Sequence, residues 1–329
     1  TNTEIRVRAR YLLACDGGRT VGPQLGIQLE GPRDIMRIVS VYMTADLSRF
    51  ARDPDVLIRW LWLPSVGALG TLVPMGPDHW GPSSEEWVFH LNYENQDTRA
   101  LDDARVVEDM KEVLGLPGLE PKVHVISRWS MEGILADRFR VGRVFLVGDA
   151  AHRHPPTGGL GLTSAVHDAQ NLCWKIAAVL AGHAGDALLA SYEPERRGAD
   201  GRNVQRSVEN GLNHAAIANA IGITPGGGVQ ANLAALRRSL DDVAHRRAVL
   251  AAIASQSMEF REHNVEYGYT YSSSAIIEDG TPAPAPLDAI RVYVPGTRPG
   301  APLPHVEVDD LDGRRHPIMD LVKPGRFLL

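Results

Sequence analysis

The chain has 329 residues and a formal net charge of −6, and 44% of its residues are hydrophobic and 22% charged. This is the composition of an ordinary folded protein, and the length is enough for one large domain or two ordinary ones. The negative charge argues against nucleic acid or an anionic membrane as the main partner. No apolar run approaches the roughly 20 residues of a membrane span, and no signal-peptide pattern is present, so we expect a cytoplasmic protein.

The first predicted element is a strand over residues 5–15, which becomes fully apolar before it ends in Asp16 and Gly17. An Asp-Gly pair after a strand is by itself an ordinary turn signal. Cys15 lies in this apolar stretch, and Cys173, the other cysteine of the chain, lies in a second one. We expect both to be buried free thiols in a reducing compartment rather than a disulfide.

Residues 25–130 are predicted to form mainly an antiparallel sheet with one face exposed to water. In the clearest strand the large apolar residues Trp87, Phe89, Leu91 and Tyr93 occupy every second position, as in a strand with one dry face. Further strands are expected over 35–47, 57–63, 69–75 and 123–129, and a helix is expected from Asp102 or Asp103 to Gly115.

Tryptophans are concentrated in the same region. Trp60 and Trp62 lie on one predicted strand, and Trp87 and Trp129 lie on two others. Such residues either line an aromatic pocket or pack in the core, and the sequence leaves both interpretations open.

The most informative stretch is residues 144–162. Its first four residues are apolar and predict a strand buried on both faces, and Gly148 and Asp149 end that strand at its carboxyl edge, where open α/β sheets bind ligands. A Pro-Pro pair that ends at Pro156 stiffens the turn, and the glycines within 158–161 let backbone N–H groups approach a ligand closely. The next helix brings its positive end to the same place. The stretch therefore predicts a site for a polyhydroxylated, electron-rich cofactor.

A helix is predicted over residues 163–182, with Thr163 as its cap and Gly182 as its stop. We interpret His167 and Asp168, early on this helix, as exposed or packing residues rather than catalysts. The stripe predicted to face inward consists of Ala165, Val166, Ala169, Leu172, Cys173, Ile176, Ala177 and Leu180.

Two long helical stretches are expected over residues 187–220 and 229–267. Pro194 should bend or delay the first of them. The glycines 226–228 between the two stretches are interpreted as a loop, and residues 281–304, which are rich in proline, predict an extended linker.

Residues 144–162 resemble the second flavin-contacting motif of the FAD-dependent aromatic hydroxylases. The His-Arg-His-Pro-Pro turn at 152–156 and the sequence Asp-Ala-Gln-Asn-Leu-Cys-Trp-Lys at 168–175 are similar to the phenol hydroxylase and 2,4-dichlorophenol 6-monooxygenase branch of that family. Asp16 and Gly17, about 130 residues earlier, resemble the family's Asp-Gly motif, which lies beside the FAD pyrophosphate and the approach path of the nicotinamide cofactor. The family usually closes that motif with Val-Arg, whereas this chain has Thr-Val-Gly at 20–22.

The resemblance implies a monooxygenase that depends on FAD and on NADPH or NADH. Such an enzyme hydroxylates a phenolic substrate ortho to the ring hydroxyl with O2, through a flavin C4a-hydroperoxide, and a homodimer is compatible with it. Asp149 would accept hydrogen bonds from the ribityl hydroxyls, and N–H groups at 159–162 would stabilise the negative charge of the reduced flavin. The implied cofactor contacts are Asp16, Gly17, Gly148, Asp149, Pro156, Gly159, Leu160, Gly161 and Leu162.

The same resemblance implies an α+β or α/β fold class. Part of a Rossmann-like FAD-binding domain (1–24 and 131–182) would combine with an antiparallel, substrate-covering sheet (25–130), followed by a helical region (183–280). A Pro-rich linker (281–304) would lead to the start of a thioredoxin-like domain (305–329), and the last residues, 325–329, read as part of a strand. No Gly-x-Gly-x-x-Gly fingerprint follows a strand. We therefore expect an internal piece of a larger enzyme, which alone is inactive and binds FAD weakly or not at all.

Several alternatives stay open at this stage. The chain could belong to a hydroxylase of polyketide-type aromatics, to a Baeyer–Villiger-type relative, or to a non-catalytic fragment that binds aromatics or needs a partner segment for FAD. We name no catalytic residue, because the family's residues nearest the phenolic oxygen come largely from a segment without a counterpart here. A metal site at His152 and His154 is not expected, since no third ligand follows at a suitable spacing.

Overall fold

The computed structural model describes residues 4–63, 68–93, 102–224 and 228–322. The chain divides into two compact units, which we describe separately. Unit 1 comprises Thr1–Gly31, Gly133–Gly211 and Gln256–Leu329, and unit 2 comprises Pro32–Glu132 and Leu212–Ser255. Within the described part of the chain, every helix is too short or too polar to cross a bilayer. The predicted strand at 325–329 and the glycines 226 and 227 lie outside the described residues.

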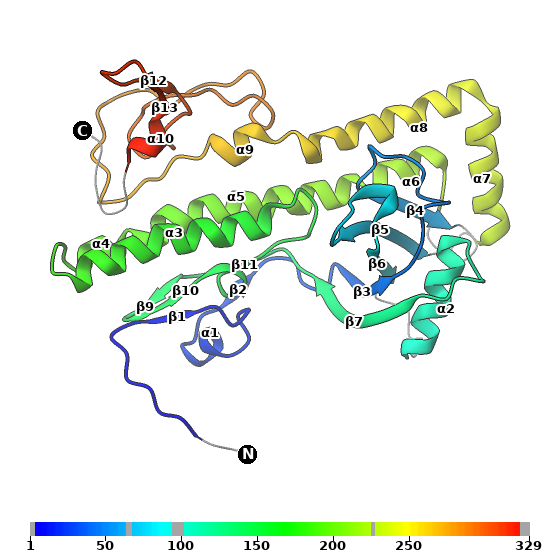
Figure 1. The fold of residues 1–329 in the computed structure, drawn as a ribbon, viewed down its shortest axis with the longest axis horizontal. Helices are drawn as coiled ribbons and strands as arrows, with labels where there is room; N and C mark the ends of the chain where they lie inside the picture. The colour runs from blue at the N-terminus through cyan, green and yellow to red at the C-terminus, as the bar shows by residue number, and fades with distance from the viewer. Residues whose placement is uncertain (1–3, 64–67, 94–101, 225–227, 323–329) are drawn as a thin grey trace. The chain divides into compact units, whose positions relative to one another are not determined.

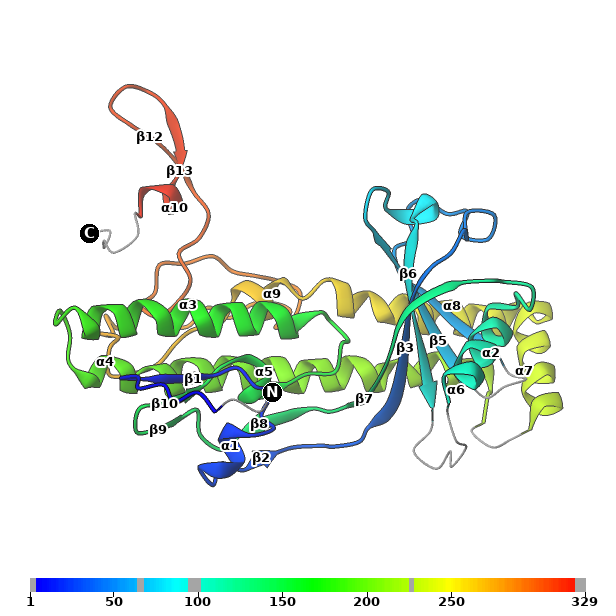
Figure 2. The same ribbon diagram turned by 60° about the horizontal axis from the view of Figure 1, so that its bottom comes forward.

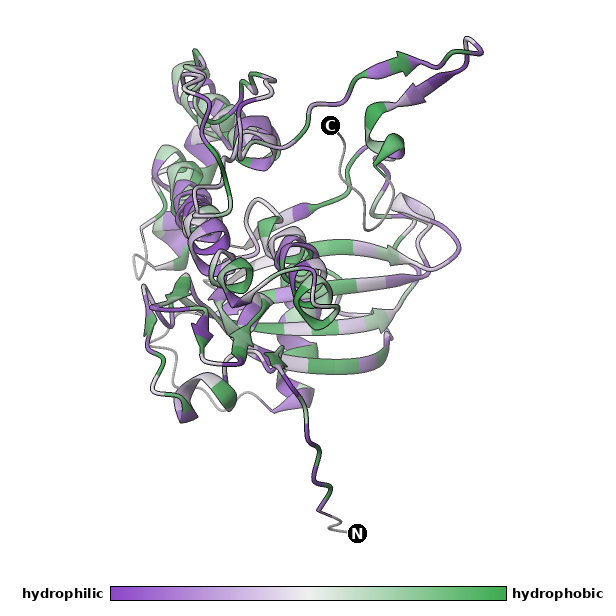
Figure 3. Ribbon diagram, turned by 90° about the vertical axis from the view of Figure 1, so that its left-hand side faces the viewer, coloured by the Kyte–Doolittle hydropathy of each residue, from purple (hydrophilic) through white to green (hydrophobic). Residues whose placement is uncertain are grey.

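Unit 2 contains a five-stranded sheet in the order β4-β5-β6-β3-β7, in which all neighbouring strands are antiparallel (Figure 2). Burial alternates strictly along β6, as the sequence predicted, and the strands of the sheet show alternating hydropathy in Figure 3. The strands are β3 (Met36–Thr44), β4 (Arg59–Leu63), β5 (Ala68–Gly76), β6 (Glu86–Tyr93) and β7 (Lys122–Met131).

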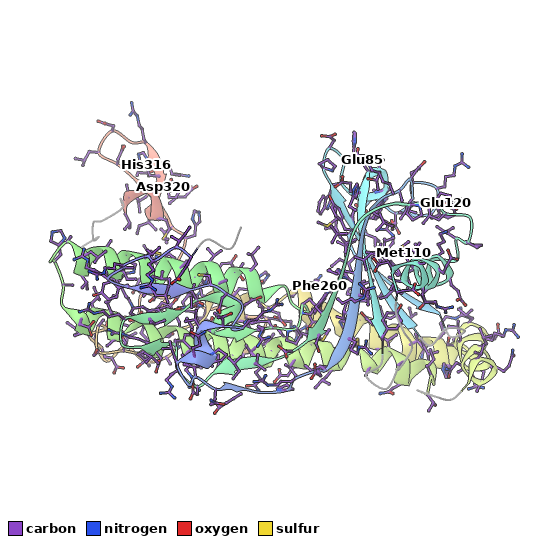
Figure 4. The ribbon with its side chains drawn as sticks, turned by 90° about the horizontal axis from the view of Figure 1, so that it is seen from below. Glu85, Met110, Glu120, Phe260, His316 and Asp320 are labelled. Carbon is purple, nitrogen blue, oxygen red and sulfur yellow. The ribbon has the colours of Figure 1, made fainter. Side chains whose placement is uncertain are left out.

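One face of this sheet packs against the helix α2 (Asp103–Leu114). Asp102 caps the helix by accepting the N–H of Arg105, and Gly115 ends it in the left-handed conformation, as the sequence predicted. Met110 of α2, labelled in Figure 4, is fully buried in the same apolar cluster as Trp87 of β6. The other helical elements of unit 2 are η1 (Gly81–Ser83), α6 (Ala215–Ile221), α7 (Val229–Asp241) and α8 (Val243–Ser255).

Unit 1 contains two small sheets and a pair of long helices. The strands β1 (Leu12–Ala14) and β10 (Val144–Leu146) are parallel neighbours, and β9 (Arg140–Val141) pairs antiparallel with β10. The second sheet has the order β11-β8-β2, with strands β2 (Leu29–Glu30), β8 (Ile134–Ala136) and β11 (His152–Arg153).

The long helices α3 (Leu160–Leu180) and α5 (Tyr192–Asn213) lie side by side in Figures 1 and 2. The short helical elements of unit 1 are α1 (Val21–Gln24), η2 (Gly148–Ala150), α4 (Asp186–Ala190), η3 (Gln256–Phe260), α9 (His263–Tyr267) and α10 (Ile318–Leu321). A hairpin of β12 (Glu307–Asp309) and β13 (Arg315–Pro317) follows residues 281–304, which contain neither helix nor strand. The mixed α/β class is observed, whereas the wider Rossmann-like assignment and the domain boundaries stay predictions.

The first predicted strand was too long. Only the three residues Leu12–Ala14 pair with β10. Ile5 and Val7, nearer the start of the predicted strand, are 80% and 81% exposed. The prediction that both cysteines are buried was also wrong, since Cys15 and Cys173 are exposed. Ala14 points into the core, so Cys15, one residue further along, faces outward.

The inward stripe predicted for the helix after the glycines was only partly right: Leu172 is buried, and Ala169 and Ile176 pack against the core. Val166 and Leu180 are exposed, whereas Ser164, Asp168, Asn171 and Lys175 are buried at helical spacing. An apolar count misses this face because its polar groups are hydrogen-bonded by polar groups of α5.

The two long helical stretches are interrupted. The first is divided among α4, α5 and α6, and the second among α7, α8, η3 and α9. Pro194 falls in the first turn of α5, where its missing N–H costs no intrahelical hydrogen bond. The helix therefore starts again at Tyr192, in agreement with the predicted delay.

Candidate functional site

The two motifs singled out in the sequence meet at one edge of the parallel strand pair. Ala14 is the register partner of Leu146, and the N–H of Val147 donates to the carbonyl of Ala14 at 3.0 Å. A Cβ on Gly18 would lie 3.3 Å from the carbonyl oxygen of Ala150, so the first loop packs directly against the turn that carries Asp149. Parallel pairing of β1 and β10 thus brings together two motifs that are about 130 residues apart in the sequence.

Asp149 lies in the one-turn helix η2 and is exposed. Within the described residues, its carboxylate accepts no hydrogen bond. The preceding Gly148 has a φ of +60°, and a Cβ on it would lie 3.1 Å from the Cβ of Ala165 on α3. Only glycine suits this position, which brings the turn against the helix and leaves the Asp149 carboxylate free for a ligand.

Asp16 is engaged differently. Its carboxylate accepts the N–H groups of Gly18 at 3.2 Å, and of Thr20 and Val21 at 2.8 Å each. The hydrogen bond from Val21 is the main reason why the pKa of Asp16 lies below its usual value. The carboxylate therefore stabilises the turn into α1, while Gly17 follows with a φ of +68°. A contact from either residue to a cofactor stays a prediction.

The glycine-rich loop leads into an open helix end. Gly159, with a φ of +65°, is the N-cap of α3, and no side chain caps the helix. A Cβ on Gly159 would meet nothing within 4 Å. Thr163 is not the predicted cap, because the helix starts at Leu160 and the Thr163 hydroxyl donates to the carbonyl of Leu160. The first N–H groups of α3 consequently have no intrahelical partner.

The side chains of this loop differ in exposure. Pro156 and Gly159 are exposed and Leu162 is 78% exposed, whereas Leu160 is buried and Gly161 is partly buried. The exposed positions surround the open helix end. Leu160 anchors the loop in the protein, so any contact from this residue to a ligand would come from its backbone.

The back of the loop is held by elements later in the chain. Thr157 donates through Oγ1 to the carbonyl of Ser207 at 2.5 Å, and the N–H of Gly158 donates to Oε1 of Glu259 at 3.2 Å. A Cβ on Gly158 would lie 2.9 Å from Nδ2 of Asn210. These contacts from α5 and η3 fix the loop from behind, and the sequence did not point to them.

A network of buried charged side chains lies directly behind the Asp149 turn. Oδ2 of Asp168 accepts the N–H of Gly148 at 2.9 Å and lies 2.8 Å from Nε2 of His152. Oδ1 of Asp168 accepts Nε–H of Arg196 at 2.7 Å, and Nη2 of Arg196 donates to Asp200 at 2.5 Å. All four charged side chains are at most 1% exposed.

The ionisation of this network follows from its contacts. Burial alone would lower the pKa of His152, but the hydrogen bond to Asp168 and the charges of Asp200 and Asp168 raise it. Burial alone would raise the pKa of Asp168, but His152 and Arg196 lower it. Burial raises the pKa of Asp200, which is more remote from His152, with Oδ2 at 3.5 Å from Nε2. Asp168 is thus the principal anion of the network.

His154 extends the network at its other end. Its Nε2 lies 3.0 Å from Nδ1 of His152. Burial, with a contribution from the charge of His152, lowers the pKa of His154 to about 3. A charged His152 can therefore donate to Asp168 through one ring nitrogen and to a neutral His154 through the other.

The sequence suggested no third possible metal ligand near His152, but the fold brings two carboxylates to it. Ligand atoms of His152, Asp168 and Asp200 all lie within 4.8 Å of one another, and all three residues are buried. The cation that compensates both carboxylates is Arg196, which contacts each of them. The geometry thus has the form of a buried ion network whose positive partner is supplied by the protein itself.

A cavity of about 290 Å³ adjoins the glycine loop inside unit 1. It is bounded by the first turns of α3, by α5 and by the segment that ends α9. Its lining includes Gly159, His167, Asn203, Tyr267 and Tyr269.

In unit 2, the sheet face opposite α2 carries a mixed polar and aromatic row. Trp60 pairs with Thr71, Thr71 with His90, and His90 with Ser40, so the four residues cross four strands on one face. The Ser40 hydroxyl lies 2.8 Å from Nδ1 of His90 and accepts Nε1–H of Trp129 at 2.9 Å. Burial lowers the pKa of His90, so the ring is neutral near pH 7.

The four tryptophans are therefore not equivalent. Trp87 is fully buried in the core, and its Nε1–H is shared between the carbonyls of Ala45 and Ser84. Trp60 is 42% exposed on the opposite face, where Trp129 bonds to the polar row. Nothing is described for the side chain of Trp62.

The geometry of unit 1 fits a flavin. A free carboxylate suits the ribityl hydroxyls, and unpaired N–H groups at a helix N-terminus suit the electron-rich end of the ring system. The open space at Gly159 allows close approach of such a ring to the backbone. Fold and site together define a cofactor-binding α/β protein of the flavin or nucleotide class.

The particular family follows from comparison with known proteins. The model of the family described as FAD binding domain matches residues 1–207, so the chain belongs to that family. This confirms FAD as the cofactor of the family and the predicted kinship with FAD-dependent aromatic hydroxylases.

Curated relatives are similar to this chain over nearly its whole length. The chain is 35% identical over 331 residues to the 2,4-dichlorophenol 6-monooxygenase of Delftia acidovorans, covering 98% of this chain and 56% of that protein. It is 30% identical over 339 residues to the phenol 2-monooxygenase of Pseudomonas sp. (strain EST1001), covering 100% and 53%. The chain thus spans about half the length of these relatives.

Solved structures agree with this assignment. The flavin-dependent monooxygenase PieE, in complex with FAD and substrate, has a TM-score of 0.84 at 34% identity, covering 96% of this chain and 55% of that one. Aklavinone-11 hydroxylase, in a ternary complex with FAD and aklavinone, has a TM-score of 0.65 at 29% identity, covering 96% and 51%.

Proposed function

We propose that this chain forms the flavin- and substrate-facing part of an FAD-dependent monooxygenase that hydroxylates a phenolic ring. One atom of O2 is added ortho to the ring hydroxyl, and NADPH or NADH is the reductant. The observation that carries the proposal is the exposed, unpaired Asp149 carboxylate on a turn that packs against α3, whose N-terminus has no side-chain cap. The phenol and dichlorophenol monooxygenases among the relatives support it.

In this proposal, Asp149 accepts hydrogen bonds from the ribityl hydroxyls, and the N–H groups at 160–162 donate to the pyrimidine end of the flavin. Their preorganised dipoles stabilise the negative charge of the reduced ring. Pro156 and Gly159 line the approach to the ring, and Asp16 and Gly17 lie towards the pyrophosphate. Bound FAD supplies the redox and oxygen chemistry, and the protein supplies orientation and exclusion of water.

We infer that the row of Trp60, Thr71, His90 and Ser40 on the sheet of unit 2 receives the aromatic substrate. Trp60 offers an exposed ring for stacking. His90 is neutral and is bonded to Ser40 at Nδ1, so its Nε2 is the ring nitrogen that remains to exchange a hydrogen bond with a phenolic hydroxyl. The row thus combines an apolar surface with one polar anchor, as small-molecule sites do.

A substrate panel tests the proposed reaction in two stages. FAD titration of the purified full-length protein, followed by flavin fluorescence, first establishes cofactor binding. Consumption of NADPH, NADH and O2 is then measured with phenol, 2,4-dichlorophenol, a resorcinol and one tricyclic polyketide aromatic, and products are identified by mass and ring position. We expect coupled formation of a catechol. Flavin reduction without any oxygenated product would refute the monooxygenase proposal.

A second candidate function is hydroxylation of larger, polyketide-type aromatics. The structure of aklavinone-11 hydroxylase contains aklavinone, and a putative polyketide hydroxylase of Streptomyces halstedii is 31% identical to this chain over 328 residues, covering 98% of this chain and 52% of that protein. A row that crosses several strands about 4.8 Å apart also offers a long surface. Coupled turnover of only a tricyclic aromatic in the same panel would favour this function.

We further propose that the protein acts in the cytoplasm, where NAD(P)H is available, and as a homodimer. The reductant is a soluble cytoplasmic metabolite, so this location fits the proposed reaction. Sedimentation velocity of the purified protein across a concentration series tests the oligomeric state, and a single monomeric species would contradict it.

A further inference from the structure

The side chains of the turn that carries Asp149 contribute little to holding the turn in place. Asp149 itself makes no side-chain hydrogen bond within the described residues, and Gly148 and Ala150 on either side are small. Its backbone closes through one short hydrogen bond, from the N–H of Ala151 to the carbonyl of Gly148 at 2.7 Å. The position of the Asp149 carboxylate therefore depends on what grips the backbone at the two ends of the turn.

One carboxylate oxygen forms hydrogen bonds at both ends of this turn. Oδ2 of Asp168 accepts the N–H of Gly148, just before Asp149, and bonds to Nε2 of His152, three residues after it. These bonds connect α3 to residues 148–152 across a completely buried contact. Charge-assisted hydrogen bonds of this kind are stronger than neutral ones and fix direction as well as distance.

The orientation of Asp168 is itself fixed from α5. Nε of Arg196 donates to Oδ1 of Asp168, which leaves Oδ2 to the turn. Arg196 is held in turn by Asp200 and by the hydroxyl of Tyr271, which accepts from Nη1 at 2.9 Å. The carbonyl of Ser164 also accepts from Nη2 at 3.2 Å, so the guanidinium is fixed at four points and holds the carboxylate of Asp168 in this orientation.

We propose that Asp168 is a positioning residue for the cofactor: through Gly148 and His152 it holds the turn that presents Asp149 to FAD. This inference rests on the proposed contact between Asp149 and the flavin. It assigns a role to a residue that the sequence had indicated only as exposed or packing. Arg196 keeps Asp168 ionised and oriented. Asp200 accepts from Nη2 of Arg196, and its other oxygen lies 3.5 Å from Nε2 of His152 but does not accept the N–H of Gly148.

Asp200 provides a matched control for Asp168. Both side chains are 0% exposed and both pair with Arg196. Only Asp168 accepts the N–H of Gly148 and lies at hydrogen-bond distance, 2.8 Å, from His152, whereas Asp200 lies 3.5 Å from that ring. We expect Asp168→Asn to weaken FAD binding at least tenfold and Asp200→Asn to weaken it less than threefold. Equal losses in the two variants would reduce Asp168 to a general structural role and overturn the proposal.

A double-mutant cycle on FAD affinity tests whether Asp168 acts through Asp149. If it does, adding Asp168→Asn to an Asp149→Ala protein should change FAD affinity less than twofold, because the group that is being positioned is already gone. Losses that multiply in the double variant would overturn the proposal. If Asp168→Asn does not fold, His152→Ala releases the far end of the turn and is taken through the same cycle, with the same two outcomes.

Hydrogen exchange of the FAD-free protein gives a second readout that needs no cofactor. In Asp168→Asn, the peptide that contains 148–152 should exchange at least tenfold faster than in the wild type, while peptides of α2 stay unchanged and Asp200→Asn resembles the wild type. Unchanged protection at 148–152 would overturn the proposal. A full-length wild-type protein that binds no FAD would refute the proposed function but leave this exchange test valid.

Discussion

Nε of Arg196 lies 2.7 Å from Oδ1 of Asp168, and the two side chains are 1% and 0% exposed. This buried pair joins the helix after the glycine loop to the next long helix, and it replaces the apolar seam that usually joins two such helices. A buried ion pair is expensive to desolvate and is tolerated when its remaining hydrogen-bonding groups are satisfied. Here the remaining groups of both residues are used to hold the Asp149 turn, Tyr271 and Asp200.

Removal of the cation should be strongly destabilising. In Arg196→Met, Asp168 and Asp200 stay buried without their common partner, which typically costs about 3–5 kcal/mol of unfolding free energy. Urea denaturation of the purified protein measures the loss. Arg128→Met, which removes a partly exposed ion pair with Asp103, should cost less than about 1 kcal/mol. A similar small loss in both variants would show that the buried network contributes little.

Loss of the Asp149 carboxylate should weaken cofactor binding without unfolding the protein. Hydrogen bonds to a charged acceptor contribute about 1.5–3 kcal/mol, so Asp149→Ala should lower FAD affinity by about one to two orders of magnitude. Flavin fluorescence titration measures it, and circular dichroism checks the fold. Asp55→Ala, at another exposed position, should bind FAD like the wild type. Unchanged affinity in Asp149→Ala would make Asp149 a turn residue only.

The part of this site that the sequence predicted is the part built from backbone. The strand that ends in Gly148 and Asp149, the left-handed glycines and the helix after them depend on local conformational preferences, which the residue types reveal. The sheet of unit 2 was predicted for the same reason, since the burial of Trp87, Phe89, Leu91 and Tyr93 follows a period of two.

The sequence analysis missed the charged network because its contacts join residues that are far apart in the sequence. Asp168 looks like a surface residue until Arg196, on another helix, is brought beside it. The available signal was a match of polar periods: Ser164, Asp168, Asn171 and Lys175 recur at helical spacing on α3, as do Arg196, Asp200 and Ser207 on α5. Two helices with complementary polar stripes can bury them against each other. A count of apolar residues instead favours a neighbouring face of α3, which contains the buried Leu172 but also the exposed Val166 and Leu180.

Substitutions of two tryptophans of unit 2 should have different effects, one on stability and the other on substrate binding. Trp87→Ala removes a fully buried ring and should cost about 3–5 kcal/mol of unfolding free energy. Trp60→Ala should change stability by less than about 1 kcal/mol but raise the KM for the phenol up to about tenfold, because a ring contact contributes roughly 0.5–1.5 kcal/mol. Urea denaturation and steady-state kinetics of both variants check this. An unchanged KM in Trp60→Ala would remove that row from the substrate site.

The acid sensitivity of the protein should depend on His154. Burial lowers its folded pKa from an ordinary 6.5 to about 3, so the unfolded state binds a proton first as the pH falls. Its contribution to stability is therefore complete above pH 6.5 and is lost as the pH falls toward 3. At pH 5 the loss is up to about 2 kcal/mol, at about 1.36 kcal/mol for each pH unit below 6.5.

Urea denaturation of the wild type and His154→Gln at pH 7.5 and pH 5 isolates this effect. His152 has the opposite sign, because its pKa is raised in the folded state and its contribution is lost as the pH rises. Both proteins retain His152, and the side-chain amide oxygen introduced by His154→Gln can still accept from its Nδ1, so the contribution of His152 largely cancels in the difference. We expect the wild type to lose up to about 2 kcal/mol more than His154→Gln between the two pH values. Equal losses would mean that His154 takes up its proton in the folded protein as readily as in the unfolded chain.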